Sequence, residues 1–249
     1  MTETDRMRLD EALVATGLAP SRSRARDMVL RGAVSVDGAT DSKPARKVGR
    51  SQKLEVDDPA ARYVSRAALK LIAGLDAFHF DPGGRDALDL GASTGGFTQV
   101  LLERGAAHVI AVDVGHGQID AAVAADPSVC SLEGLNTRDL AAEHLDGRHI
   151  DAVVADVSFI SLRLALPPAL ELAQPGAWGV FLVKPQFEVG RALIAKGGIV
   201  RDAAAASRAA ESLAAWLEDE HGWSVVGLLP SPISGGDGNR EFLLGARRG

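Results

Sequence analysis

The chain has one cysteine in 249 residues, Cys130, so no disulfide can form within it. The neighbours of Cys130 are apolar, and we expect a buried strand residue there rather than a nucleophile. No uninterrupted apolar run reaches the ~18 residues of a membrane-spanning helix. The first residues, MTETDRMRLDEALV, lack the basic start and apolar stretch of a secretory signal. These absences predict a cytoplasmic protein without a membrane segment.

The six histidines lack the paired spacing that metal ligands typically show, so we expect no metal site. The length fits one α/β domain of ordinary size with a small additional domain, and leaves no room for a third. The hydrophobic fraction of 46% is that of a globular protein. We therefore expect two domains, and a monomer in solution.

Positive charge is concentrated in one part of the chain. Residues 21–53 hold nine Lys or Arg against three Asp, a net charge of +6, whereas the whole chain carries -6. The remaining residues therefore carry -12. Contacts of Lys and Arg with phosphates supply most of the non-specific affinity of proteins for nucleic acids. The asymmetry favours a basic, polyanion-binding module on an acidic enzyme, with a solvated basic face as the alternative.

This basic part has the pattern of a small α+β domain. Leu9 and Leu13 share one face of a predicted helix over 8–14, and Ser21 is the predicted N-cap of a second helix. The order of helix, basic helix and then G-A-V-x-V-D-G resembles the RNA-binding domain of the ribosomal-protein S-four type, over residues 7–60. The resemblance implies RNA contacts by basic residues, for which the candidates are Arg8, Arg22, Arg24, Arg26, Arg31, Lys43, Arg46 and Lys47.

Two acids, a proline and small residues in DDPAAR then indicate a linker. We expect the RNA-binding domain over 1–58, the linker over 59–64 and a second domain over 65–249. In the second domain, strands predicted over 87–90, 109–112, 151–156 and 177–183 alternate with predicted helices, including one over 161–173. A mobile loop is predicted over 184–202. This alternation predicts an α/β fold, a mostly parallel, Rossmann-like sheet with helices on both faces.

A glycine turn follows the first of these strands, in the sequence ALDLGASTGGFT at 87–98. Glycines let the chain turn sharply and a ligand approach closely, and Asp113 follows at about the separation of a ribose-binding acid. The spacing G-x-x-x-G-G differs from that of dinucleotide sites. Asp89 would repel a phosphate and attract the ammonium or sulfonium of S-adenosylmethionine (SAM). We predict a SAM site, with a purely structural turn as the alternative.

Four charged residues fall where a sheet of this kind has its active edge. Lys70 is on the helix before the first strand, Asp156 and Lys184 follow two middle strands, and Glu241 begins the last strand. Two lysines and two acids can form a nearly neutral cluster. The alternative is four separate surface charges.

Seven ordered motifs resemble the TlyA family, also called haemolysin A. They are YVSRAALKL (63–71), LDLGASTGGFT (88–98), AVDVGHGQ (111–118), ADVSFISL (155–162), VKPQFEVGR (183–191), KGGIVRD (196–202) and SPISGGDGNREFLL (231–244). The resemblance covers nearly the whole chain and implies a SAM-dependent ribosomal RNA 2'-O-methyltransferase with an FtsJ-type domain of the class I methyltransferase fold. Ala67, Ala68 and His116 depart from the glycines and the tyrosine that family members often have, without removing a catalytic group.

The resemblance also assigns roles to residues. The family's catalytic Lys-Asp-Lys-Glu set falls on Lys70, Asp156, Lys184 and Glu241, with Lys184 as general base, Asp156 orienting it and Glu241 holding Lys70. We expect the methionine end of SAM at Asp89, Gly91, Ala92, Ser93, Thr94 and Gly95, its ribose at Asp113 and its adenine at Asn136. Ser158 and Phe159 are candidates for contact with the target nucleotide, and a core position is the alternative for Phe159.

Three other functions are alternatives to this one. A pore-forming haemolysin should show a signal, an amphipathic membrane segment or a barrel hairpin, and none is visible. A nicotinamide-dependent oxidoreductase does not fit the spacing of the glycine turn. An RNA-binding ribosome-assembly factor with a vestigial methyltransferase domain is a further alternative, and a measurement of SAM binding would separate it from an active methyltransferase. Specificity for the nucleotide and the ribosomal subunit depends on surface shape, which the sequence does not determine.

Overall fold

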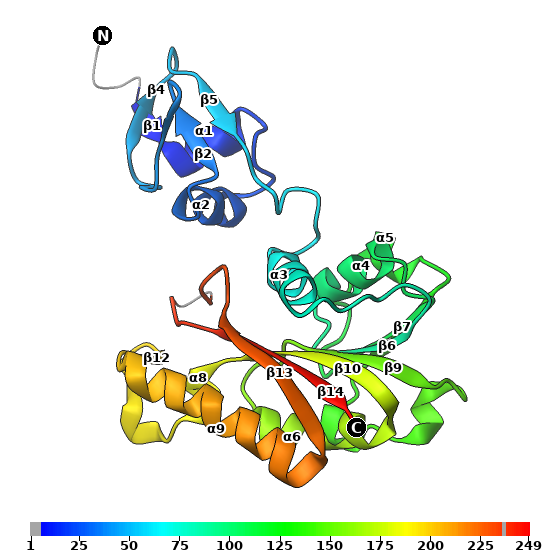
Figure 1. Cartoon of the computed structure of the whole chain (residues 1–249). Coiled ribbons are helices and arrows are strands. Elements are labelled where there is room, and N and C mark those ends of the chain that lie inside the picture. The colour runs from blue at the N-terminus through cyan, green and yellow to red at the C-terminus, as the bar shows by residue number, and fades with distance from the viewer. Residues whose placement is uncertain (1–5, 236–237) are drawn as a thin grey trace. The chain divides into compact units, whose positions relative to one another are not determined.

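The computed structural model describes residues 6–235 and 238–249. The chain divides into two compact units, with the division between Ala61 and Arg62, and each unit has a hydrophobic core of its own (Figure 1). Gly236 and Asp237, which belong to the last motif quoted above, lie outside the described residues. None of the described helices is long and apolar enough to cross a membrane.

The amino-terminal unit packs two helices against short strands. Its elements are β1 (Arg6–Arg8), α1 (Leu9–Ala15), α2 (Arg22–Leu30), β2 (Val34–Val36), β3 (Ala39–Thr40), β4 (Lys47–Gly49) and β5 (Leu54–Val56). Strand β2 pairs antiparallel with β3 and β5, and β1 pairs antiparallel with β4. Ser21 caps α2, because its Oγ accepts a hydrogen bond from the backbone N–H of Arg24 at 3.3 Å. Leu9 and Leu13 are fully buried, which confirms the predicted apolar face of α1.

The carboxyl-terminal unit is built on a seven-stranded sheet. In spatial order its strands are β13 (Trp223–Pro230), β14 (Phe242–Arg248), β10 (Ala173–Val183), β9 (Ile150–Ala155), β6 (Asp86–Leu90), β7 (His108–Asp113) and β8 (Val129–Glu133). From β10 to β8 the strands are parallel, whereas β14 is antiparallel to both β10 and β13. The mostly parallel sheet is therefore confirmed. Phe242 pairs with Val183, so the start of β14 lies beside the carboxyl end of β10.

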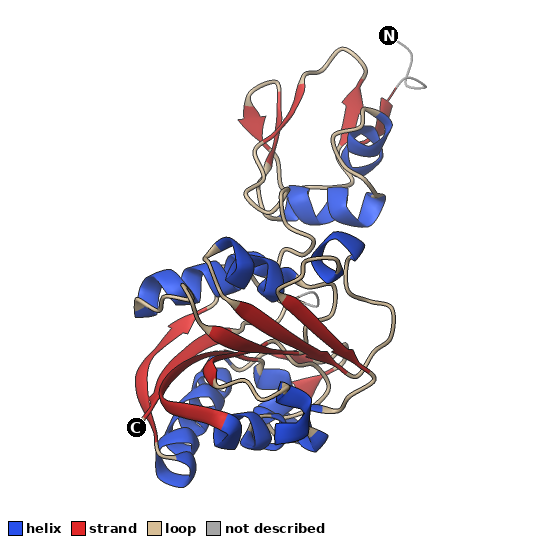
Figure 2. Ribbon diagram, turned by 90° about the vertical axis from the view of Figure 1, so that its right-hand side faces the viewer, coloured by secondary structure: helices blue, strands red, loops and turns tan. Residues whose placement is uncertain are grey.

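Helices cover both faces of this sheet (Figure 2). Helices α3 (Ala68–Phe78) and α4 (Gly96–Glu103) contribute Leu71, Leu75 and Val100 to the core on one face. On the other face the core contains residues of α6 (Leu162–Ala165), α7 (Pro167–Leu172) and α9 (Ala203–His221). A further short helix, α5 (Ala121–Ala124), follows β7. The predicted arrangement of helices on both faces is confirmed.

Three local predictions are wrong. The helix predicted over 161–173 is the two helices α6 and α7, because Pro167 cannot continue a helix and begins a new one. Residues 184–202, predicted as a loop, form α8 (Pro185–Glu188), a 3-10 turn at Arg191–Leu193 and a hairpin of β11 (Ile194–Ala195) and β12 (Ile199–Val200). Cys130 is exposed rather than buried, because β8 is an edge strand of the sheet.

Candidate active site

The glycine turn after β6 is shaped by close contact with the loop that follows β9. Gly91 and Gly95 have φ angles of 78° and 91°, in the left-handed region that favours glycine. A Cβ on Gly91 would lie 2.9 Å from the carbonyl oxygen of Asp156, so a larger residue would displace the turn. A Cβ on Gly95 would lie 2.9 Å from Cγ1 of Val123. Gly95 is therefore required by packing against α5.

Two neighbouring cavities lie beside the turn. The larger, of about 720 Å³, is lined by Gly91, Ser93, Asp113 and Asn136 among the predicted cofactor residues. The smaller, of about 160 Å³, is lined by Ala92 and Thr94 together with the catalytic candidates Asp156 and Lys184. Gly91, Ser93, Asp156 and Ser158 line both cavities. Predicted cofactor and catalytic residues thus share one edge of the sheet.

The carboxylate of Asp113 ties together two segments that line the larger cavity. Its Oδ2 accepts a hydrogen bond from the backbone N–H of Ser93 at 2.8 Å, and its Oδ1 accepts one from Gly115 at 2.7 Å. Each oxygen keeps a further lone pair for a donor such as a ribose hydroxyl. Asp113 is therefore placed to hold a ribose at the end of β7.

Glu133, at the end of the next strand, orders the other side of this loop. Its Oε2 accepts from the backbone N–H of Gly117 at 2.6 Å, and its Oε1 accepts from Gln118 at 2.9 Å. The hydrogen bonds from Gly117 and Gln118 lower the pKa of this carboxyl. Glu133 was not among the residues selected from the sequence, although it carries the same signal as Asp113, an acid that ends a strand.

Asn136 presents its amide group to the larger cavity. Its Oδ1 accepts hydrogen bonds from the backbone N–H and the Nε of Arg138, at 3.1 and 3.2 Å, and so caps a 3-10 turn at Thr137–Asp139. The carboxamide NH₂ is then the part of Asn136 that can donate to a ligand. An acceptor nitrogen of adenine is a group that it could bind.

The four catalytic candidates form two buried ion pairs. Nζ of Lys184 lies 2.7 Å from Oδ1 of Asp156, and Nζ of Lys70 lies 2.6 Å from Oε2 of Glu241. The side chains of Lys70 and Glu241 are only 7% and 3% exposed, so this pair has little contact with water. These are the two partnerships predicted from the sequence. Within the described part of the chain, no group of three or more His, Cys, Asp or Glu could hold a metal ion.

Ser158 is a second partner of Lys184. Nζ of Lys184 donates a hydrogen bond to Oγ of Ser158 at 2.7 Å. From the sequence Ser158 was predicted only as a contact of the target nucleotide, because nothing in the motif shows that its hydroxyl faces a lysine 26 positions away. Two fixed acceptors, Asp156 and Ser158, therefore define the orientation of the Lys184 amine.

Asp89 lies inside the fold and lines neither cavity. It is fully buried, its Oδ2 accepts a hydrogen bond from Oγ1 of Thr98 at 2.7 Å, and its Oδ1 has no hydrogen-bond partner among the described residues. Burial raises the pKa of the Asp89 carboxyl to about 7, although the Thr98 hydroxyl favours the carboxylate, and Asp156 raises it further. A buried carboxylate with an unpaired oxygen favours a nearby cation. This property fits the positively charged end of SAM.

The raised pKa of Asp89 predicts a pH dependence that the Asp89→Asn variant should lack. Because the pKa rises from 3.8 to about 7 on folding, the folded chain holds a proton that the unfolded chain releases between these values. The free energy of unfolding should then fall as pH rises through this window, by up to about 1.4 kcal/mol per pH unit from this group. In urea unfolding at several pH values, the free energy of unfolding of the Asn variant should rise relative to that of the parent protein as the pH increases to about 7. A constant difference between the two would contradict the prediction.

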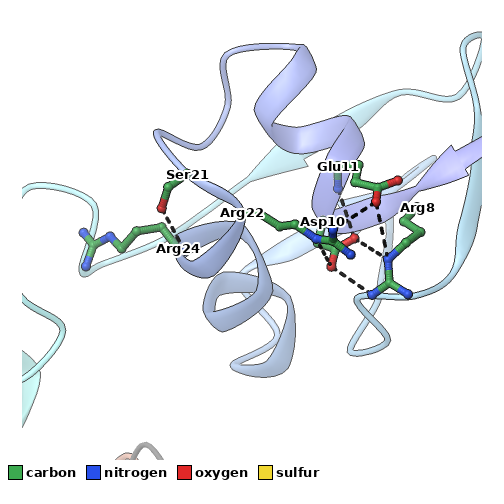
Figure 3. A network of polar contacts seen from close by, with 6 residues as sticks. All are labelled: Arg8, Asp10, Glu11, Ser21, Arg22 and Arg24. Atoms are coloured by element: carbon green, nitrogen blue, oxygen red, sulfur yellow. Dashed lines mark hydrogen bonds and ion pairs between the residues drawn. The ribbon is translucent and has the colours of Figure 1, made fainter.

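The basic candidates of the amino-terminal unit differ in how far their charge is already paired. Figure 3 shows Arg8 and Arg22 around the buried carboxylate of Asp10, at 2.9 and 3.3 Å from Oδ2. Hydrogen bonding from Arg8 lowers the pKa of Asp10. The Arg22 side chain is still 58% exposed and also contacts Glu11. Arg22, the first residue of α2, therefore links this helix to α1 and still has exposed surface for a ligand, whereas the contacts of Arg8 are with the first turn of α1.

Arg31 has a structural role. Its side chain is 12% exposed and lies between the carboxylates of Asp27 and Asp58, at 2.9 and 2.8 Å. A guanidinium that is mostly buried and paired with two carboxylates has little surface left for a phosphate. The position of Arg31 therefore favours a structural role over the RNA contact predicted from the sequence.

The other basic candidates are partly or fully exposed. Arg46 pairs with Asp41 but remains 40% exposed, and Arg24 is half-buried on α2. Arg26, Lys43 and Lys47 are exposed. These last three are the residues best placed by exposure to contact a polyanion.

Comparison with known proteins assigns each unit a counterpart. The chain matches the FtsJ-like methyltransferase family over residues 63–248 and the S4 domain over residues 7–54. The carboxyl-terminal unit, with its glycine turn and two ion pairs, is the part that matches the methyltransferases. The amino-terminal unit, with the excess of basic residues, is the part that matches the S4 domain.

Individual relatives are similar over nearly the full length. The chain is 46% identical over 243 residues to a Mycobacterium tuberculosis protein named 16S/23S rRNA (cytidine-2'-O)-methyltransferase TlyA, covering 97% of this chain and 90% of that protein. It is 38% identical over 237 residues to Hemolysin A of Brachyspira hyodysenteriae, covering 95% and 98%. The solved structure of a candidate hemolysin from Streptococcus thermophilus has a TM-score of 0.76 and 38% identity, covering 98% of this chain and 89% of that one.

Proposed function

Because this chain belongs to the TlyA family of FtsJ-like methyltransferases, we propose that it methylates the ribose 2'-hydroxyl of a cytidine in ribosomal RNA. The observation that carries this proposal is the Lys184 amine, held by Asp156 at the wall of a cavity that the glycine turn also lines. The cavity thus brings a candidate base and the predicted cofactor residues to the same place.

A ribose 2'-hydroxyl is a poor nucleophile at neutral pH, so a neighbouring group must accept its proton as it attacks. A neutral lysine amine has two N–H donors and one lone pair. One N–H donates to Oγ of Ser158 at 2.7 Å, and in the proposal the other faces Oδ1 of Asp156, the ion-pair partner that lies 2.7 Å from Nζ. The lone pair is then free to accept the proton of the hydroxyl. Lys184 is the general base in this proposal, and Asp156 and Ser158 orient it.

The cofactor residues hold SAM, which supplies a methyl group already activated by its sulfonium. In the proposal Gly91, Ala92, Ser93 and Thr94 line the methionine end, Asp113 accepts from the ribose hydroxyls and Asn136 donates to the adenine. Asp89 attracts the positive charge from within the fold. Gly95 shapes the turn by its packing against Val123.

The Lys70–Glu241 pair lies near the start of β14. Since Glu241 directly precedes Phe242, which pairs with Val183, this carboxylate is anchored beside the end of the strand that leads to Lys184. Because Lys70 lies 2.6 Å from Glu241, the opposite charges of the two buried side chains compensate each other. In the proposal the pair sets the field around the base without accepting the proton.

Phe159 is the proposed contact of the target nucleotide. Its side chain is 92% exposed, which excludes the core position left open by the sequence. Its φ of 65° is a strained conformation for an aromatic residue, and its ring packs against Phe187 with 5.5 Å between centroids. An exposed aromatic ring next to Ser158 offers a face on which a base can stack.

Asp113→Ala should weaken SAM binding. The variant loses the acceptor for the ribose and also the two backbone hydrogen bonds that hold Ser93 and Gly115. We expect the dissociation constant for SAM to rise by roughly ten- to a hundredfold, as expected for the loss of charge-assisted hydrogen bonds. Isothermal titration calorimetry measures it, with Asp219→Ala as a control that removes an exposed acid of α9. An affinity unchanged from the parent protein would remove Asp113 from the ribose site.

The proposed function is tested with ribosomal subunits from a strain that lacks this protein. Each purified subunit is incubated with the protein and SAM labelled in its methyl group, and incorporation into RNA is measured. Transfer to either subunit supports the proposal and assigns the substrate. Binding of subunits without any transfer would instead indicate an RNA-binding assembly factor.

A further inference from the structure

Two loops at the active edge lie against each other along their whole length. One follows β9 and holds Asp156, Ser158, Phe159 and Ser161, and the other follows β10 and consists of Lys184 and α8. Strands β9 and β10 are parallel neighbours, with Ala155 paired to Phe181, so the two loops leave the sheet side by side.

The contacts between these loops come in a regular order. Lys184 bonds to Asp156 and Ser158, Phe187 packs on Phe159, and Glu188 bonds to the start of α6. The base is at one end of this series of contacts, and Glu188 is at the other. Helix α8 is a single turn that joins Lys184 to Glu188, and proline is its first residue. The contacts of Lys184 at one end and of Glu188 at the other therefore determine the direction of this helix.

The carboxylate of Glu188 makes two hydrogen bonds across the loops. Its Oε2 accepts from Oγ of Ser161 at 2.6 Å, and its Oε1 accepts from the backbone N–H of Leu162 at 2.8 Å. Both oxygens are therefore used, and the side chain is half-buried. Leu162 N–H has no other acceptor in the first turn of α6, because an initial helical N–H lacks an intrahelical partner.

We propose that Glu188 is a positioning residue for methyl transfer, which sets the orientation of Lys184 by fixing α8 to the loop that holds Asp156 and Ser158. It lies four positions after the base and touches the opposing loop, not the reactants. This inference rests on the proposed function, since it assumes that Lys184 is the base. A displacement of about 1 Å at a reacting group can cost on the order of a hundredfold in rate.

The test compares three substitutions with different bonding capacity. Glu188→Ala loses both hydrogen bonds. Glu188→Gln keeps the length, because its Oε1 can accept from Leu162 while its NH₂ donates to Ser161 Oγ. Glu188→Asp keeps the charge but is one methylene too short to reach both donors. Glu211→Ala, which removes an exposed acid of α9, is the matched control.

Single-turnover methyl transfer is measured with saturating SAM and ribosomal subunits, together with SAM affinity, the melting temperature and the pH profile of the rate. We expect Glu188→Ala to be about 10- to 100-fold slower with SAM affinity unchanged, Glu188→Gln to recover most of the rate, and the control to match the parent protein. The pH profile of the Ala variant should be displaced, because the surroundings of Lys184 change.

Two outcomes would overturn the inference. One is a Glu188→Ala rate close to that of the parent protein. The other is that, in every variant, a lower rate comes with a proportionally weaker SAM affinity and lower melting temperature. If Glu188→Ala does not fold, the other two substitutions decide, because positioning predicts that Gln is faster than Asp and the reverse order contradicts it. If the parent protein transfers no methyl group to either subunit, the proposed function itself is refuted. If the parent protein is active and the Glu188 variants are equally active, only the role of Glu188 is refuted.

Discussion

Replacing Lys184 by alanine should abolish methyl transfer while leaving SAM binding nearly intact. The amine that Asp156 and Ser158 hold is the proposed acceptor of the 2'-hydroxyl proton, and alanine removes it. Loss of a general base typically lowers a rate by ~10²- to 10⁴-fold. The cofactor should be little affected, because its predicted contacts are with the glycine turn, Asp113 and Asn136.

Single-turnover kinetics and calorimetry separate these two effects. Lys196→Ala, which removes an exposed lysine between β11 and β12, controls for the loss of a positive charge on this unit. It should bind SAM and transfer methyl at the parent rate. A Lys184→Ala variant with a near-parent single-turnover rate would show that another group accepts the proton.

The second large effect is expected when the amino-terminal unit is removed. Residues 62–249 contain both cores of the methyltransferase unit and both ion pairs, so they should fold and bind SAM. They lack the segment that carries a net charge of +6 and should bind ribosomal subunits poorly. We expect methyl transfer to subunits at physiological salt to fall by on the order of 10²-fold or more. Transfer by residues 62–249 at the rate of the whole chain would show that this unit is not the anchor.

Point substitutions can test the same division without removing a domain. Arg22 and Arg31 are poor choices for charge reversal, because a carboxylate at either position would face Asp10 or Asp58 and unfold the unit. Replacing Arg26, Lys43 and Lys47 by glutamate avoids this problem, since all three are exposed. The triple variant should keep its melting temperature and SAM affinity, and the salt dependence of subunit binding should become shallower.

The sequence predicted those features that depend on local pattern and on position in the sheet. Lys70 and Glu241 are far apart in the chain, yet both were selected because the edge of a parallel sheet gathers residues at strand ends. The same logic selected Asp113, Asp156 and Lys184. The spacing of Leu9 and Leu13 and the N-cap at Ser21 likewise follow from short-range rules.

Other features depend on which side chains meet in the folded chain, and no local pattern reveals them. Asp89 was expected to line the cofactor site, but its side chain is buried in the fold, where it accepts a hydrogen bond from Thr98. Arg31 directly follows α2, and its pairing with Asp58, 27 positions later in the chain, depends on the tertiary structure. Ser158 contacts Lys184, and Glu188 contacts the start of α6, because the loops that follow β9 and β10 lie side by side. Such contacts need the tertiary structure.

The chemical position of the methyl group tests the central claim most directly. Ribosomal RNA from a strain lacking the protein is incubated, within its subunits, with the protein and SAM, then digested to nucleosides and analysed by mass spectrometry. We predict that 2'-O-methylcytidine appears with the intact chain and is absent with Lys184→Ala. A methyl group on a base, or equal amounts of 2'-O-methylcytidine with both proteins, would contradict the proposed active site.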